Sequence, residues 1–326
     1  MHPPDPFARE LRQALDAAVE GVPFRELRDA ARRLSEVYRA GGQAASVDGA
    51  STPVGALAYA VTRMPATLAA ARTVFRELRA RTGDLPVTTL LDLGAGPATT
   101  LWAAACELPA LTRATLVEPN RAMTTLGQQL LVGTSVLAGV ETTWQVEPPA
   151  VTPTEGSYDL VISGYVLTEL DISERAAVVA QAWQACRHAV VVILPGSVAG
   201  FGVLLDVRQQ LLELGATVIA PCPHADACPL PDGDWCHFGA RLNRSSLHRR
   251  LKGGALPYED EKFSYLVATR DVGAPAMARV LRRPVMANRR VALKLCRVDG
   301  LRDETVTRSH REAYRVARKV EWGGAW

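Results

Sequence analysis

The sequence predicts an α/β protein whose central sheet is mostly parallel. From residue 87 onward, short apolar runs rich in β-branched residues alternate with helical stretches, which is typical of βαβ units. Before that point, Pro6–Ala40 and Pro53–Arg81 carry apolar residues three and four positions apart, which indicates helices. The expected strands are Thr88–Leu93, Ala114–Glu118, Glu141–Val146, Tyr158–Ser163, His188–Leu194, Lys262–Thr269 and Val291–Arg297. We therefore expect a seven-stranded sheet that follows a set of N-terminal helices.

The chain divides into four expected regions. They are an N-terminal helical region at residues 1–84, a Rossmann-like core at 85–220, a cysteine-rich metal-binding insertion at 221–256, and C-terminal strands that complete the sheet and end in a basic helix at 257–326. Residues 41–51 are small and polar, which indicates a loop. Pro221–Phe238 is dense in Pro, Cys, Asp and Gly, so it predicts an irregular insertion between the fifth and sixth strands. Thr307–Lys319 is expected to form the terminal helix.

The charge of the chain is unevenly distributed. The overall net charge is +3, but residues 241–326 hold 20 Lys and Arg against 9 Asp and Glu, a net charge of +11, and the preceding 240 residues carry −8. An apolar fraction of 48% over 326 residues is ample for a large core. The basic C-terminal third therefore indicates a polyanionic partner of an otherwise ordinary globular protein.

The expected location is the cytoplasm, without a membrane partner. No stretch approaches the roughly 20 apolar residues of a membrane helix, and charged residues such as Arg9 and Glu10 interrupt the first fifteen positions. Thiols stay reduced in that compartment. The six cysteines therefore suggest metal binding or catalysis before disulfides.

A glycine-rich turn follows the first expected strand. Asp92, Gly94 and Gly96 belong to the run LDLGAGPAT, where a strand ends and a helix begins. Glycines there let the backbone turn tightly and approach a ligand, in proteins that bind NAD, FAD or S-adenosylmethionine (SAM). Thr99 occupies the third position of the dinucleotide pattern and disfavours a pyrophosphate. Asp92 places a carboxylate where it can meet a cationic methionyl group, so the loop favours SAM.

A second acid ends the second expected strand. Glu118 lies 22 residues after Gly96, and a carboxylate about 20 residues beyond such a loop accepts hydrogen bonds from ribose hydroxyls. We therefore expect Glu118 to bind the ribose of SAM in a class I SAM-methyltransferase fold. The alternative interpretation is that Asp92 and Glu118 only cap helices.

The catalytic residues cannot be assigned from the sequence. Tyr165 and Glu169 follow the fourth strand, where methyltransferases place their substrate, but they can equally cap and pack a helix. The Asn-Pro-Pro-Tyr motif of amino-group methylases is absent there, and no cysteine follows the fourth or fifth strand closely. No catalytic base is predicted.

The irregular insertion carries a concentration of cysteines. Its members are Cys222, Cys228 and Cys236, at intervals of six and eight. Thiolate ligands explain this spacing better than core packing does. The candidates for a fourth ligand are His224, His237 and Cys296. A zinc site and an iron–sulfur cluster both fit these ligands, and the wide spacing slightly favours the cluster. Cys106 and Cys186 lie in apolar helical runs and are expected in the core.

The combined motifs resemble a known family. They are Asp92-Leu-Gly-Ala-Gly-Pro, Cys222-Pro-His with Cys228-Pro and Trp235-Cys236-His-Phe, Tyr258-Glu-Asp-Glu-Lys-Phe-Ser-Tyr265, and the late Cys296. Between about Tyr59 and Trp322 the chain is similar to methyltransferase-like assembly factors of the mitochondrial small ribosomal subunit and their bacterial relatives. The resemblance implies a class I methyltransferase fold, a [4Fe–4S] cluster on Cys222, Cys228, Cys236 and Cys296, and binding to small-subunit rRNA during assembly. It also implies that methyl transfer is lost in some members.

The expected terminal helix carries an arginine stripe. Its members are Arg308, Arg311, Arg315 and Arg318, which are three, four and three positions apart and therefore share one helix face. Segregated positive charge of this kind favours RNA phosphates as the partner. The alternative interpretation is a set of ordinary solvated surface arginines.

Three hypotheses for the function follow. The first is a SAM-binding, iron–sulfur protein that methylates small-subunit rRNA or supports ribosome assembly. The second is a non-catalytic assembly factor that retains the methyltransferase fold. The third is a zinc-containing small-molecule methyltransferase, which the basic C-terminal third disfavours.

Overall fold

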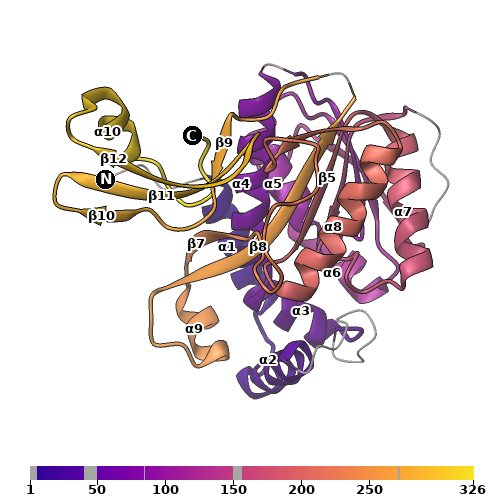
Figure 1. Ribbon diagram of the computed structural model, residues 1–326. Coiled ribbons are helices and arrows are strands. Elements are labelled where there is room, and N and C mark those ends of the chain that lie inside the picture. The colour runs from indigo at the N-terminus through magenta and orange to yellow at the C-terminus, as the bar shows by residue number, and fades with distance from the viewer. Residues whose placement is uncertain (1–5, 40–49, 84, 150–155, 271) are drawn as a thin grey trace.

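A computed structural model describes residues 6–39, 50–83, 85–149, 156–270 and 272–326. Its larger sheet contains β1 (Thr89–Leu93), β2 (Arg113–Val117), β3 (Glu141–Gln145), β4 (Tyr158–Gly164), β5 (Cys186–Pro195), β6 (Thr217–Ala220), β7 (Phe238–Asn243) and β8 (Tyr258–Thr269). The strand order is β3-β2-β1-β4-β5-β8-β6, and β7 pairs with β8 (Figure 1). The strands β1 to β5 pair in parallel, whereas β8 is antiparallel to its neighbours. This is the expected methyltransferase-like α/β fold.

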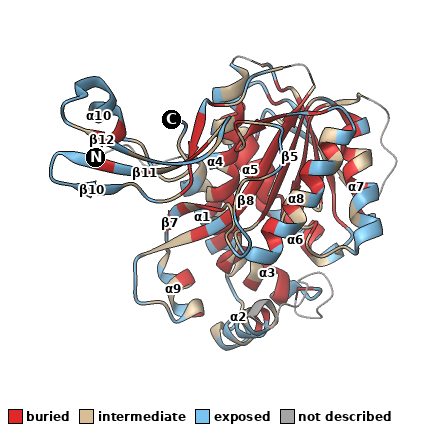
Figure 2. Ribbon diagram, in the orientation of Figure 1, coloured by how far each residue is buried: buried red, intermediate tan, exposed pale blue. Residues whose placement is uncertain are grey.

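Helices cover both faces of this sheet. They are α1 (Pro6–Ala18), α2 (Phe24–Arg39), α3 (Pro53–Thr62), α4 (Met64–Thr82), α5 (Thr99–Glu107), α6 (Arg121–Leu131), α7 (Ile172–Ala185), α8 (Val198–Glu213) and α9 (Ser246–Lys252). Side chains alternate between the faces of a strand, so β5 directs Val191 and Ile193 to the core shared with α1 to α6. Val190 and Val192 pack instead in the core shared with α7 and α8. Figure 2 shows that the buried residues concentrate in the strands and the inner helix faces.

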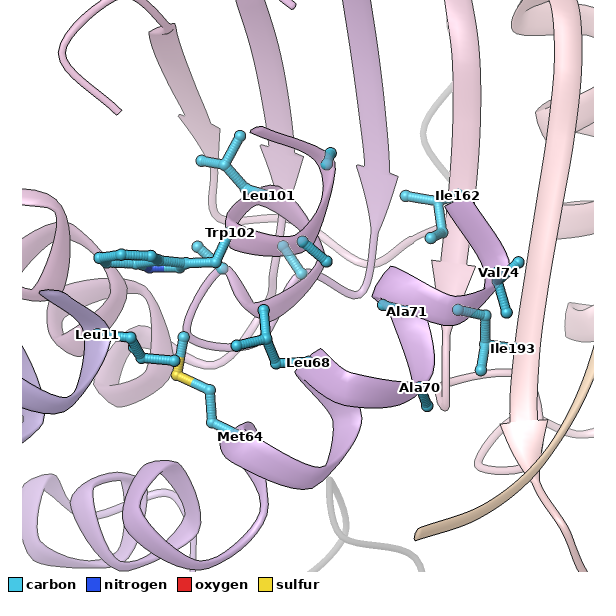
Figure 3. Packing of buried hydrophobic residues seen from close by; sticks show 14 of the residues in the cluster. Leu11, Met64, Leu68, Ala70, Ala71, Val74, Leu101, Trp102, Ile162 and Ile193 are labelled. Carbon is cyan, nitrogen blue, oxygen red and sulfur yellow. The ribbon is translucent and has the colours of Figure 1, made fainter. Parts of the chain in front are cut away.

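The N-terminal helices are part of the main domain. In Figure 3, the fully buried Trp102 of α5 lies near Met64 and Leu68 of α4 and Leu11 of α1. The small side chains of Ala70 and other alanines on α4 let this helix pack closely on its neighbours. Truncation of a buried aromatic residue of this kind costs about 3–5 kcal/mol of stability. The helices therefore hold the sheet through a shared core.

A second, four-stranded sheet stands beside the main domain (Figure 1). It consists of β9 (Ala278–Val280), β10 (Val285–Ala287), β11 (Arg290–Arg297) and β12 (Gly300–Thr307), and it is followed by α10 (Arg311–Ala317). All its pairings are antiparallel. Its small core is formed by Val280, Val291, Leu293, Leu295, Val306 and Ala317.

Arg279 connects the two parts of the molecule. Its side chain is 1% exposed. The guanidinium forms an ion pair with Glu77 of α4 at 2.5 Å and donates hydrogen bonds to the carbonyl oxygens of Pro221 at 3.0 Å and Gly323 at 2.8 Å. Three segments far apart in sequence are therefore fixed to β9.

Two expectations for the C-terminal region are wrong. Val291–Arg297 does not complete the large sheet, because β11 pairs with β12 and β10 in local hairpins. Its alternation of buried Val291 and Leu293 with exposed Ala292 is typical of an antiparallel strand with one solvated face. Over the described residues the large sheet has eight strands and not the expected seven, because β6 and β7 were both missed. The cysteine loop lies between these two strands, and the expected 221–256 insertion contains β7 and α9.

Other boundaries also differ from expectation. The terminal helix covers Arg311–Ala317 and not Thr307–Lys319, because the chain up to Thr307 belongs to the hairpin strand β12. The expected loop at 41–51 lies mostly outside the described residues. Among the described residues, none of the helices has both the length and the apolar character needed to cross a membrane.

Candidate functional site

The glycine loop follows β1 at the carboxyl edge of the sheet. Gly94 has a φ of +80° and Gly96 a φ of +54°, values that favour glycine. The amide nitrogen of Gly94 donates to the carbonyl oxygen of Val117 in β2 at 2.9 Å. A Cβ at Gly94 would lie 2.8 Å from the Val166 Cβ, so a larger residue would displace the segment after β4. The loop therefore requires glycine at position 94 for both its conformation and its packing.

Glu118 closes this loop from the neighbouring strand. Its carboxylate accepts hydrogen bonds from the amide nitrogens of Gly96 and Asn120, each at 2.8 Å. Burial raises the pKa of Glu118, and these two hydrogen bonds act in the opposite direction. Helix α6 is capped by Asn120, and α5 has no side-chain cap. Neither Glu118 nor Asp92 is therefore a helix cap.

The glycine loop and Glu118 line an open cleft. Its walls also contain Tyr59, Asn120, Tyr165 and Glu169. Asp92 lies beneath the cleft and not among its lining residues: one carboxylate oxygen accepts a hydrogen bond from the Thr100 hydroxyl, and the other is buried without a partner in the described structure. Burial raises the pKa of Asp92 well above its ordinary value, and the nearby Glu118 raises it further. Three of the four predicted cofactor residues, Gly94, Gly96 and Glu118, therefore line the cleft, and the fourth, Asp92, is buried beneath it.

Two tyrosines complete this cleft. Tyr165 follows β4 with a φ of +67°, a conformation that is uncommon outside glycine. Its hydroxyl donates to Glu261 of β8 at 3.4 Å. Burial raises the pKa of Tyr165 well above its ordinary value and that of Tyr59 to about 12. Sequence reasoning missed Tyr59 and Glu261, which carry no local motif, whereas Asn120 after Pro119 has the pattern of a helix cap.

The four predicted cysteine ligands share one cavity. Cys222, Cys228 and Cys236 come from the loop between β6 and β7, and Cys296 comes from β11 of the second sheet. His224, Arg208 and Arg279 also line this cavity. The Cys296 sulfur lies 3.5 Å from His224 Nε2. Cys106 and Cys186 are not among the lining residues, and Cys186 is buried in the second core cluster.

Burial favours the protonated form of three of these thiols, those of Cys222, Cys236 and Cys296. It raises the pKa of Cys222, that of Cys236 well above its ordinary value, and that of Cys296 to about 12, and the neighbouring cysteines raise the last two further. Among the described residues, no three His, Cys, Asp or Glu side chains form a group that could hold a single metal ion. The cavity therefore brings four cysteine side chains together, although they do not form such a group.

Hydrogen bonds from the main domain hold the cysteine loop. The indole of Trp235 donates to the Gly196 carbonyl oxygen at 3.0 Å, and the Ser264 hydroxyl donates to the Cys236 carbonyl oxygen at 2.7 Å. From α8, Arg208 donates to the carbonyl oxygens of His224 at 2.9 Å and Asp226 at 2.8 Å. A segment without helix or strand therefore has its backbone fixed at several points.

The predicted arginine stripe surrounds one basic hollow. Arg308 and Arg318 lie outside the helix itself, since α10 covers only Arg311–Ala317. All four members of the stripe nevertheless line the hollow, together with Arg289 and Lys319. These side chains are exposed, and within the described part of the chain none has a carboxylate within ion-pair distance. We call this set the basic hollow.

Several other basic residues of the C-terminal third form ion pairs. Arg241 and Arg283 both pair with Asp260, at 2.7 and 2.9 Å. Glu259 pairs with Arg244 at 2.5 Å and Lys252 at 2.7 Å, and Asp234 pairs with Arg282 and Lys294. The basic hollow is therefore a cluster of exposed basic side chains that no described carboxylate pairs with, whereas these other residues are paired.

Comparisons with known proteins agree on a family. The model of a family described as mitochondrial small ribosomal subunit Rsm22 matches residues 53–326. The human mitochondrial ribosome assembly protein METTL17 is 30% identical over 296 residues, which cover 82% of this chain and 61% of the human protein. The chain thus spans less than two thirds of that relative.

Solved structures provide more distant likenesses. Two crystal structures of magnesium protoporphyrin IX methyltransferase from Synechocystis, one with S-adenosylhomocysteine and one with SAM, are 17% and 13% identical to this chain. They cover 63% and 80% of this chain and 83% and 97% of their own, each with a TM-score of 0.42.

Asp92→Asn is expected to stabilise the ligand-free protein. Because the pKa of Asp92 is raised in the folded protein, ionisation of this carboxyl destabilises the fold. This penalty is absent below the unfolded pKa of about 3.9 and grows as the pH rises toward the folded pKa. We expect the variant to gain about 1–3 kcal/mol at pH 7, the range for a buried unsatisfied group, with less gain at pH 4.5. Urea unfolding at both pH values measures this.

Asp159→Asn is the matched comparison. Burial alone would raise the pKa of Asp159, but hydrogen bonds from Thr88 and Thr89 outweigh it and hold the pKa below its ordinary value. Its substitution should therefore destabilise the protein at pH 7. A loss of stability in Asp92→Asn at that pH would contradict the account of Asp92.

Glu118→Ala is expected to weaken SAM binding by about tenfold or more. Loss of a hydrogen bond to a charged group is worth about 1.5–3 kcal/mol, and 1.4 kcal/mol is a factor of ten. Isothermal titration calorimetry measures the affinity, with the exposed Glu141→Ala as the control. Equal affinities for Glu118→Ala and wild type would exclude Glu118 as a ligand residue.

Proposed function

The chain belongs to the Rsm22 family, and from that membership we propose that it is a ribosome-assembly protein that binds small-subunit rRNA through the basic hollow. The observation that carries the RNA part is the set of exposed arginines without described carboxylate partners. Phosphates supply the negative charge that these side chains lack. The family description and the name of the human relative support the assembling small ribosomal subunit as the partner.

SAM is the proposed ligand of the cleft beside the glycine loop. One carboxylate oxygen of the buried Asp92 has no hydrogen-bond partner in the described structure. A cationic ligand in the cleft can offset the negative charge of this carboxylate. Glu118 keeps free lone pairs for ribose hydroxyls while two backbone amides hold it in place. SAM would supply an electrophilic methyl group there. Gly94, Gly96 and Glu118 would bind and orient it, and the buried Asp92 would support the loop from beneath.

Methyl transfer to rRNA is the second candidate activity. Tyr165 lies in the cleft, but its raised pKa keeps the phenol protonated at neutral pH, so it is a poor general base. We therefore favour an assembly factor that binds SAM over an active rRNA methyltransferase. The basic hollow disfavours the third hypothesis, a zinc-containing small-molecule methyltransferase.

A [4Fe–4S] cluster is the proposed occupant of the cysteine cavity. A zinc ion holds each sulfur at about 2.3 Å, so its ligands must lie close together, whereas a cluster spreads four thiolates over four irons. Four cysteine side chains that line one cavity are the donor set that such a cluster takes. The cluster would cross-link the loop to β11 and so stabilise the position of the second sheet. A histidine-containing zinc site is the alternative.

A cytoplasmic location belongs to the same proposal. None of the six cysteines forms a disulfide in the described structure, as suits a reducing compartment. Oxygen-sensitive clusters also persist better where thiols stay reduced. Fractionation of the native host cells, followed by detection of the protein in the soluble fraction, checks this part of the proposal.

Anaerobic purification should yield about four irons and four sulfides per chain. Broad visible absorption should accompany them and should be lost in Cys296→Ser, because that thiol is the only link from β11 to the cavity among the described cysteines. Cys106→Ser, outside the cavity, is the matched control and should keep the cluster. One zinc without sulfide, indifferent to Cys296, would refute the cluster and make His224 the next candidate.

Charge reversal in the basic hollow should weaken rRNA binding. In Arg311→Glu with Arg315→Glu, affinity for small-subunit rRNA should fall, and the slope of log affinity against log salt should flatten by about 0.7–0.9 per lost phosphate contact. Arg25→Glu with Arg33→Glu changes the same charge on the exposed face of α2. If both double variants bind alike, the basic hollow is not the RNA site.

A further inference from the structure

Arg208 is a buried cation without a described anionic partner. It lies on α8 with 5% of its surface exposed. Its two hydrogen bonds go to the neutral carbonyl oxygens of His224 and Asp226. Its Nε is buried without a hydrogen-bond partner. No carboxylate of the described chain lies within ion-pair distance of it.

A buried charge of this kind is costly unless a counter-charge is present. Carbonyl oxygens satisfy its hydrogen bonds but carry no net charge. The groups nearby that can become anionic are the thiols of the same cavity. The cavity thus holds four cysteine side chains beside a buried arginine that has no carboxylate partner among the described residues.

Arg279 lines the same cavity but differs in this respect. Glu77 forms an ion pair with it at 2.5 Å, and the same carboxylate also pairs with Arg81 at 3.2 Å. Its remaining hydrogen bonds go to the carbonyl oxygens of Pro221 and Gly323. Of the two arginines that line the cavity, only Arg208 therefore has no carboxylate partner in the described structure.

We propose that Arg208 is the counter-charge of the [4Fe–4S] cluster and raises its reduction potential. The inference rests on the proposed function, since it presupposes the cluster. Four thiolates exceed the positive charge of the cluster core, so the bound group is anionic, and one-electron reduction adds a further negative charge. A nearby cation stabilises the reduced form more than the oxidised form. Arg208 is a positioning residue in this sense and not a ligand.

Two variants separate charge from hydrogen bonding at this position. Arg208→Gln removes the charge and keeps a donor for the loop carbonyls, whereas Arg208→Lys keeps the charge and loses the planar fork. Arg270→Gln is the matched control. Arg270 also donates to two carbonyl oxygens, of Cys186 at 3.1 Å and Trp183 at 2.8 Å, at the opposite edge of the sheet.

The test is a dithionite titration of the anaerobically purified full chain, followed by visible absorption and electron paramagnetic resonance, with iron and sulfide measured in each variant. We expect a more negative midpoint potential in Arg208→Gln, and values near wild type in Arg208→Lys and Arg270→Gln. Cluster loss in Arg208→Gln but not in Arg208→Lys would support the same role for the charge.

Other outcomes would overturn the inference. An unchanged potential in Arg208→Gln at wild-type iron and sulfide content would remove the electrostatic role and leave the cluster proposal intact. Equal shifts in Arg208→Gln and Arg208→Lys, or cluster loss in both, would assign Arg208 to loop geometry alone. A wild-type protein without iron and sulfide would refute the proposed cluster and this inference together.

Discussion

The buried ion pair between Arg279 and Glu77 is the contact on which the arrangement of the molecule depends. It joins β9 to α4, and the same guanidinium holds the start of the cysteine loop and the C-terminal segment at Gly323. Removal of Glu77 would cost about 3–5 kcal/mol, because the Arg279 charge would stay buried and unpaired. Through this contact the second sheet brings Cys296 to the loop cysteines and fixes the basic hollow relative to the sheet.

Helix α4 links the two candidate ligand sites. Near its start, Thr67 and Ala71 line the hollow beside the glycine loop, and two turns later Glu77 holds Arg279 at the cysteine cavity. The cysteine loop follows β6, which runs parallel to β5 because both are antiparallel to β8. Both sites therefore lie toward the carboxyl edge of the sheet, where open α/β sheets bind their ligands. Helix α4 therefore contributes residues to both sites.

Local patterns explain which parts of the fold were predictable. The strands β1 to β5 are buried apolar runs separated by amphipathic helices, and periodicity identifies them. The four-residue β6 is too short to have a pattern. The sheet in which β11 pairs depends on its partners, β10 and β12, and a strand does not specify its partner by composition. The Arg308 to Arg318 stripe was found by its spacing, although only part of it is helical.

The sequence by itself determined the glycine loop with Glu118 and the three loop cysteines, because in each case the chemistry lies within a short segment with a distinctive spacing. Resemblance to a family, and not spacing, selected Cys296. Only the tertiary structure decided that Asp92 lies beneath the cleft and that Tyr59 and Glu261 approach Tyr165. It also decided which exposed arginines have no carboxylate partner among the described residues. Ion pairs such as Arg241 with Asp260 form between strands, across distances in sequence that no local pattern records. The charge available for a partner is therefore a property of the folded surface and not of composition.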